Sequence, residues 1–121
     1  MRAFQVPNVQ FVSLQYGAMD AEIDRVRKEY GIDVAQAADI DNFNDIDGLA
    51  ALIHACDRTV SIDNVTVHPT GALGKKIDAL LPRVSNWSWG THPNKSCWYQ
   101  SVQLRRQSES EDWAEVLAQF S

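Results

Sequence analysis

Short runs of apolar residues alternate with polar and amphipathic segments along the chain. The runs are rich in Val, Ile, Leu and Phe, as in strands that are buried in a parallel sheet. Between them, apolar residues recur at spacings of three and four, which indicates helices. The pattern predicts strands at residues 11–14, 33–37, 59–62, 77–81 and 102–105, and helices at residues 21–30, 46–56, 65–73 and 111–120.

Strands that alternate with helices predict an α/β fold, here a three-layer Rossmann-like domain with a mainly parallel five-stranded sheet. We expect the strand order 2-1-3-4-5, in which the winding direction changes between the first and third strands. The loop at residues 15–17 then faces the turn at residues 63–68 across one crevice, where ligands of such sheets bind. The length of 121 residues suits one domain, residues 1–121.

The most informative segment is the strand, turn and helix that begin at residue 59. Asp63 ends the strand, and Asn64 suits a helix N-cap because its side-chain oxygen can accept amide hydrogens of the first turn. His68 follows one turn later on the same face, and Gly74 suits the left-handed residue that ends a helix. In the simplest interpretation these residues only cap the helix of a crossover. In the alternative, Asp63, Asn64 and His68 contact the hydroxyls and diphosphate of one ligand.

This segment, SIDNVTVHPTGALGK at residues 61–75, resembles a motif of glycosyltransferase family 9, the heptosyltransferase group. The motif is the strand, Asp-Thr-Ala-x-x-His turn and glycine-containing helix of the donor-binding half. The chain is more similar still to the family-9-like domains that follow tetratricopeptide repeats in many bacterial proteins. Further matching segments occur in the same order from about Gln10 onward, namely FVSLQYG, IDGLAALIHACD, LLP, NWSWG, SCWY, LRRQ and DW.

The resemblance implies the C-terminal half of a two-Rossmann (GT-B) glycosyltransferase, the half that holds the nucleotide-sugar. The chain is long enough for one half only, so we expect the acceptor half and its catalytic base to be absent, and the catalytic residues stay unknown. We expect the donor diphosphate to be held by backbone amides of residues 64–66, without a metal or a cofactor. The expected substrate-binding residues are Gln15, Gly17, Asp63, Asn64, Thr66 and His68.

Several residues depart from the family pattern. Asn64 stands where relatives usually have Thr, Pro69 stands where Leu is usual, and Lys76 with Asp78 replaces a proline and an apolar residue. Pro69 lies close enough to the predicted helix start that its missing N–H should cost little. Asp78 is harder to accommodate, because a buried charge is costly unless it is paired. We therefore expect this end of the strand to be exposed.

Residues 82–100 predict a long loop that carries Trp87, Trp89, Trp98 and Tyr99. Two interpretations stand side by side. The indoles stack on the base or sugar of a bound nucleotide, or they form a small core that covers one edge of the sheet. If the loop is exposed, its apolar surface predicts self-association or a tight contact with a partner.

Composition limits the partners. The net charge is −5 and the basic residues are dispersed along the chain, which argues against nucleic acid beyond a mononucleotide. No apolar run is long enough to span a membrane and no signal peptide begins the chain, so we expect a cytoplasmic protein. Cys56 and Cys97 are expected to be free thiols. The acidic residues 39–47 form a solvated connector rather than a metal site, because they lack the ligand spacing for calcium or zinc.

Two functions of different classes follow from the sequence. In the first, the chain is the nucleotide-sugar-binding half of a glycosyltransferase, inactive in isolation, which works with a separate acceptor domain. In the second, it is a non-catalytic remnant that acts as a binding or protein-interaction module and associates with itself or with another protein. Retention of Asp63 and His68 favours ligand binding, whereas the missing acceptor half favours the second function for the chain in isolation.

Overall fold

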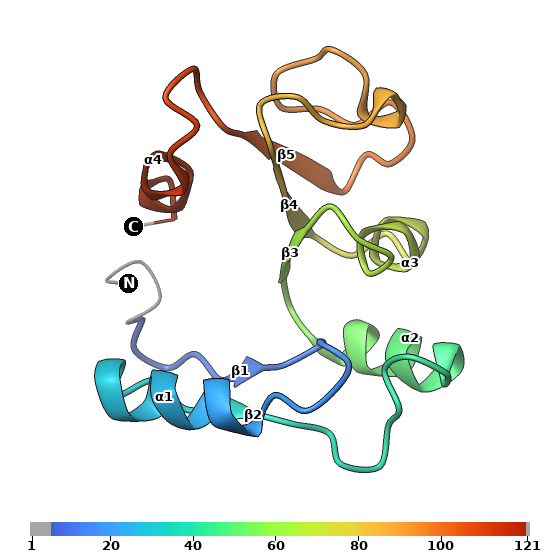
Figure 1. The fold of residues 1–121 in the computed structure, drawn as a ribbon. Coiled ribbons are helices and arrows are strands. Elements are labelled where there is room, and N and C mark those ends of the chain that lie inside the picture. The colour runs from blue at the N-terminus through green and yellow to red at the C-terminus, as the bar shows by residue number, and fades with distance from the viewer. Residues whose placement is uncertain (1–5, 121) are drawn as a thin grey trace.

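The computed structural model describes residues 6–120, which form two separate parallel sheets and four α-helices (Figure 1). The first sheet pairs β1 with β2, and the second has the order β3-β4-β5. Helices α3 and α4 lie on opposite sides of the three-stranded sheet. In chain order the elements are β1 (Phe11–Val12), α1 (Asp20–Tyr30), β2 (Val34–Ala35), α2 (Ile46–Ala55), β3 (Thr59–Ile62), α3 (Val67–Ala72), β4 (Ile77–Leu81), the 3-10 helix η2 (Trp87–Trp89), β5 (Val102–Arg106) and α4 (Trp113–Ala118).

The three-stranded sheet carries the main hydrophobic core. β4 lies at its centre, with Ile77 in register with Thr59 of β3 and with Val102 of β5. In the edge strand β5 the alternate residues Val102 and Leu104 are buried, whereas in the central strand β4 every residue except Leu80 is buried, as expected for a strand that is covered on both faces. The core cluster consists of Val67, Ile77, Ala79, Leu81, Trp89, Val102 and Leu104, with Tyr99 packed against it.

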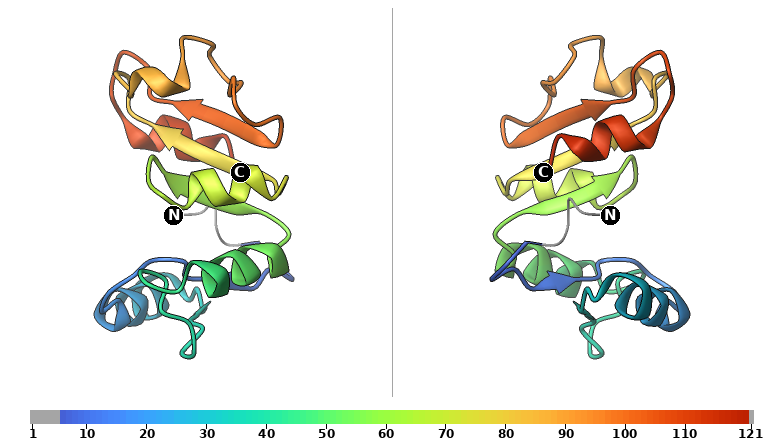
Figure 2. Two further views of the ribbon diagram at one scale, coloured as in Figure 1. Left: turned by 90° about the vertical axis from the view of Figure 1, so that its right-hand side faces the viewer. Right: turned by 90° about the vertical axis from the view of Figure 1, so that its left-hand side faces the viewer.

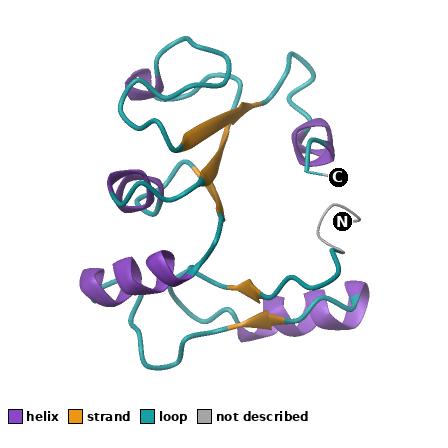
Figure 3. Ribbon diagram, turned by 180° about the vertical axis from the view of Figure 1, so that it is seen from behind, coloured by secondary structure: helices purple, strands orange, loops and turns teal. Residues whose placement is uncertain are grey.

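The single five-stranded sheet predicted from the sequence is wrong, and with it the three-layer Rossmann-like arrangement. The neighbours 2-1, 3-4 and 4-5 are present and parallel, but β1 does not pair with β3. Figures 2 and 3 show the two sheets as separate parts, with α1 and α2 beside the smaller one. The β1–β2 ladder has only two residue pairs, and Val60 and Ile62 of β3 stay exposed. Apolar runs indicate strands, but they do not specify which edges pair.

The helix ends follow local signals only in part. Asp45 caps α2 as the amide of Gly48 donates to its carboxylate at 2.8 Å. α1 begins at Asp20, one residue earlier than predicted, and Met19 precedes it without a side-chain cap. α3 begins at Val67, later than expected, because Asn64 closes a turn ahead of the helix and accepts the amide of Thr66 at 3.0 Å. Gly74 has φ 67°, the left-handed conformation expected after α3.

Asp78 is buried and paired, contrary to the expectation of an exposed strand end. Its side chain is in the middle strand and the residue is only 2% exposed. Arg58 donates its Nε to Asp78 Oδ2 at 2.6 Å, and Arg105 donates its Nε to Oδ1 at 2.8 Å. Both guanidiniums also lie over the Phe120 ring, 5.5 Å from its centroid. The charge is therefore balanced within the sheet, and the same cluster attaches the C-terminal segment.

No helix within residues 6–120 has both the length and the apolar character needed to cross a membrane.

Candidate functional site

The turn after β3 meets the loop after β4 through a hydrogen bond between side chains. Asp63 lies at the carboxyl end of β3, and its Oδ1 accepts the indole N–H of Trp89 at 2.9 Å. Trp89 is 1% exposed and belongs to the hydrophobic core, whereas Asp63 is exposed. One carboxylate oxygen thus anchors the loop, and among the described residues the other oxygen has no hydrogen-bond partner.

His68 completes an aromatic cluster beside Asp63. Its imidazole stacks on Trp89, with ring centroids 5.4 Å apart and an angle of 18° between the planes. Its Nδ1 lies 3.2 Å from the Tyr99 hydroxyl, and the Tyr99 ring meets it edge-on at 5.9 Å. Because Nδ1 is engaged and the residue is exposed, Nε2 is the nitrogen that can exchange a hydrogen bond with a ligand.

Asn64 and Thr66 form hydrogen bonds within the turn and the start of α3. The Oδ1 of Asn64 accepts both the Ser61 hydroxyl at 2.9 Å and the Thr66 amide at 3.0 Å. Thr66 is buried, and its carbonyl accepts the hydroxyl of Thr70 at 2.7 Å. The Thr66 amide can bind a diphosphate only after Asn64 turns away, so Asp63 and His68 are the more accessible groups.

Gln15 and Gly17 belong to the loop after β1, in the part of the molecule with the smaller sheet. The Gln15 carbonyl accepts the side-chain amide of Asn42 at 3.1 Å, and Gly17 has φ 90°. Among the described residues, no hydrogen bond joins either residue to the 63–68 turn. The structure therefore brings Asp63 and His68 together and leaves the loop at residues 15–17 outside their contacts.

Arg106 is a residue that the sequence pattern does not single out. Its guanidinium donates to the carbonyls of Trp89 at 3.1 Å, Gly90 at 2.9 Å and His92 at 3.2 Å, and to the Ser85 hydroxyl at 2.6 Å. The signal that points to it is its place at the end of the last strand, in register with Leu81, from which the loop departs. Arg106 holds the backbone that positions Trp89.

The three tryptophans of the loop have different environments. Trp89 is a core residue, as in the interpretation of a small core, whereas Trp87 is 85% exposed. Trp98 is also exposed, and its indole N–H donates to the Ser88 carbonyl at 2.7 Å. Of the two interpretations left open by the sequence, the small core holds for Trp89, while Trp87 and Trp98 stay available to a partner.

Gly71 allows the aromatic cluster to pack closely on α3. A Cβ atom at this position would lie 2.5 Å from Cγ of Tyr99, far inside van der Waals contact. Any larger residue would therefore displace the Tyr99 ring from His68. The glycine at this position of the family-9 motif is therefore explained in this chain by the close packing of Tyr99 on α3.

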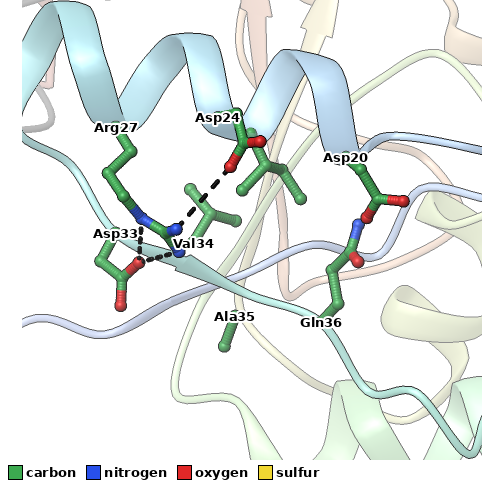
Figure 4. Close-up of a pocket in the computed structure, with 8 residues that line it drawn as sticks. Asp20, Asp24, Arg27, Asp33, Val34, Ala35 and Gln36 are labelled. Atoms are coloured by element: carbon green, nitrogen blue, oxygen red, sulfur yellow. Dashed lines mark hydrogen bonds and ion pairs between the residues drawn. The ribbon is translucent and has the colours of Figure 1, made fainter.

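In a hollow between α1 and β2, Arg27 pairs with two acidic side chains (Figure 4). Arg27 donates to Asp33 Oδ1 at 2.6 Å and lies 3.7 Å from Asp24 Oδ1. Nearby in the chain, hydrogen bonds from the Asn44 side chain and then from the Phe43 and Asn44 amides lower the pKa of Asp41 and order the acidic loop. These acidic residues have structural partners.

Comparison with known proteins finds a curated relative that matches part of the chain. No family model matches the chain, and no solved structure matches it. Protein FlbA of Caulobacter vibrioides is 38% identical over 97 residues, which is 79% of this chain. The chain covers 16% of the length of FlbA, so the similarity concerns one segment of a much longer protein.

Proposed function

We propose that the chain binds a nucleotide diphosphate sugar and supplies the donor-binding half of a glycosyltransferase site. The observation that carries the proposal is the convergence of Asp63 and His68 at the carboxyl end of β3, against the indole of Trp89. Ligands of open parallel sheets bind at this end of the strands. The family-9 resemblance of residues 61–75 supports the same place and the same ligand class.

Asp63 and His68 contact different groups of the ligand. Asp63 Oδ2 accepts hydrogen bonds from hydroxyls of the ribose or the transferred sugar, while Oδ1 keeps its bond to Trp89. His68 Nε2 donates to a diphosphate oxygen, and its Nδ1 is held by Tyr99. Charge-assisted hydrogen bonds of this kind stabilise the leaving diphosphate in a transfer that needs no metal.

Transfer requires a second half that carries the acceptor and the base. We propose that another domain or chain supplies it, and that the chain works in the cytoplasm, where the free thiols Cys56 and Cys97 stay reduced. In FlbA the matching segment is joined to a far longer polypeptide, which is the kind of arrangement that the proposal requires.

The test is a titration with uridine, guanosine and adenosine diphosphates and their sugars, followed by backbone amide and histidine ring chemical shifts. We expect shifts at residues 63–68 and a dissociation constant near 1 mM, about −4 kcal/mol, because half a cleft supplies half of the contacts. The same samples should show no transfer to any acceptor.

Two variants separate binding from folding. Asp63→Asn keeps an oxygen for the Trp89 indole but removes the charge, and His68→Phe keeps the stacking but removes both ring nitrogens. Each should weaken binding at least about fivefold with an unchanged midpoint of unfolding, whereas Glu109→Gln, on the surface elsewhere, should bind as the parent does. Saturating ligand without shifts at residues 63–68 would refute the donor site.

A second function is favoured by the exposed face of the loop. Trp87 and Val84 are 85% and 84% exposed on a segment whose backbone Arg106 holds in place. Rigid, exposed aromatic side chains are typical of contact surfaces between proteins. If no nucleotide binds, we propose that the chain acts through this surface as a non-catalytic interaction module.

A further inference from the structure

Charge is distributed unevenly along this acidic chain. Residues 75–108 contain six of its 11 basic residues but only one of its 16 acidic residues, Asp78. The basic residues are dispersed over the sequence as a whole, but this segment is basic by itself. Because Asp78 is already paired with Arg58 and Arg105, the segment leaves a surplus of positive charge.

Much of this surplus lines one groove. The groove has a volume of about 1140 Å³ and lies at the amino ends of β3, β4 and β5, opposite to the edge that carries Asp63. Arg58 precedes β3, Lys76 precedes β4, and Lys95 lies alongside β5 through a bridge to Gln103. Its charged lining consists of Arg58, Lys76, Lys95, Arg105, Asp57 and Asp78.

The four cations of the groove outnumber its two carboxylates, so the lining carries a formal charge of +2. Arg58 uses Nε and Nη2 toward Asp78, while Arg105 uses Nε toward Asp78 and Nη1 toward Gln119. Each guanidinium thus keeps N–H groups for another acceptor. Within the described part of the chain, no carboxylate lies within 4.0 Å of the ammonium group of Lys76 or Lys95.

We propose that this groove binds a small phosphate-bearing anion of about two to three negative charges, such as a diphosphate. Planar guanidiniums and mobile ammonium groups are the side chains that proteins use for phosphate oxygens. A lining of +2 offsets most of the charge of such a compact anion. A long nucleic acid is disfavoured, because the other 15 acidic residues lie outside this segment and would repel it.

The site is distinct from the proposed donor site and does not depend on it. Tyr99 is the side chain that the two places share, since its ring lines the groove and its hydroxyl meets His68. The test therefore changes the lysines, which do not contact His68.

The experiment titrates inorganic pyrophosphate into the whole chain at constant ionic strength and follows amide and lysine side-chain chemical shifts. We expect saturable shifts at Lys76, Lys95 and residues 100–102. Lys76→Gln and Lys95→Gln should each raise the dissociation constant at least about threefold, and added salt should weaken binding. Lys28→Gln, on α1 beside the other sheet, should leave it unchanged.

A parallel titration with adenosine diphosphate distinguishes a free diphosphate from a nucleotide, because only the nucleotide adds a base that can shift the Tyr99 ring. Shifts that never saturate, or equal affinity for pyrophosphate in Lys95→Gln and Lys28→Gln, would overturn the proposal. Saturation confined to residues 63–68 would also overturn it, while leaving the donor site supported.

Discussion

At the scale of single residues, the contacts of Asp78 explain how the sheet accommodates a charge in its central strand. The carboxylate is buried, and Arg58 and Arg105 reach it from segments 20 and 27 residues away. A buried charge without partners would cost several kcal/mol, and two guanidiniums compensate this cost. The same cluster places both arginines over Phe120, so one acidic side chain links β4, β5 and the residue before β3 with the C-terminal end.

We expect Asp78→Ala to lower the free energy of unfolding by about 1–3 kcal/mol. Breaking a fully buried pair costs about 3–5 kcal/mol, but here the value is reduced because Arg58 is half-exposed and can hydrate. Denaturation with urea measures the change. Asp33→Ala, which removes the exposed partner of Arg27, is the control and should cost no more than about 0.5 kcal/mol. Equal losses in the two variants would contradict this role of Asp78.

At the scale of elements, the loop at residues 82–100 is ordered by side chains that bind backbone. Asn86 caps the 3-10 helix through the Ser88 amide, Trp98 donates to the Ser88 carbonyl, and Arg106 donates to three further carbonyls. The loop also bridges to β5, where Leu104 donates its amide to the Asn94 carbonyl at 3.0 Å. These bonds explain how a long segment with little regular structure presents Trp89 to Asp63 in one conformation.

Replacing Arg106 by Lys should loosen this loop. One ammonium group cannot reach three carbonyls and the Ser85 hydroxyl at once, as the planar guanidinium does. We expect a loss of stability of about 1–2 kcal/mol and faster hydrogen exchange at the amides of Trp89 and Gly90, which bond within the turn.

Arg83→Lys is the matched control, because Arg83 lies 3.9 Å from Glu111 in an exposed ion pair. Its exchange rates should equal those of the parent chain. Unchanged exchange at Trp89 in Arg106→Lys would show that the loop is held by other contacts.

At the scale of the whole molecule, the two sheets leave apolar surface uncovered. Val60 and Ile62 of β3 are exposed where a neighbouring strand was expected, and Trp87 is exposed on the loop at the other edge of the sheet. Large exposed apolar residues at either edge can belong to a contact surface. The expected self-association or partner contact remains a prediction.

We expect the chain to self-associate at high concentration through the loop surface. Sedimentation velocity should show a concentration-dependent increase in mass, and Trp87→Ser should reduce it at least about fivefold because it removes the most exposed indole. Trp113→Ser, at the start of α4, is the control and should associate as the parent does. A strict monomer at high concentration would refute association through this surface.

Much of the local structure was determined by the sequence itself. The bounds of β3 and β4 are those predicted, because a short run of mostly apolar or β-branched residues between polar turns leaves few alternatives. The Asp45 cap and the left-handed Gly74 also follow from interactions within one turn of the chain. The neighbourhood of Asp63 and His68 was predicted for the same reason, since they lie five positions apart across one turn.

Only the tertiary structure decided which distant residues meet. The hydrogen bond from Trp89 to Asp63 spans 26 positions and that from Arg105 to Asp78 spans 27, so neither leaves a periodic signal in the sequence. Strand pairing is of the same kind, because an apolar run favours burial without specifying its neighbour, and β1 and β3 consequently lie in different sheets. The burial of Trp89 and the exposure of Trp87, two positions apart in one loop, depend on packing against β4 and β5 rather than on residue type.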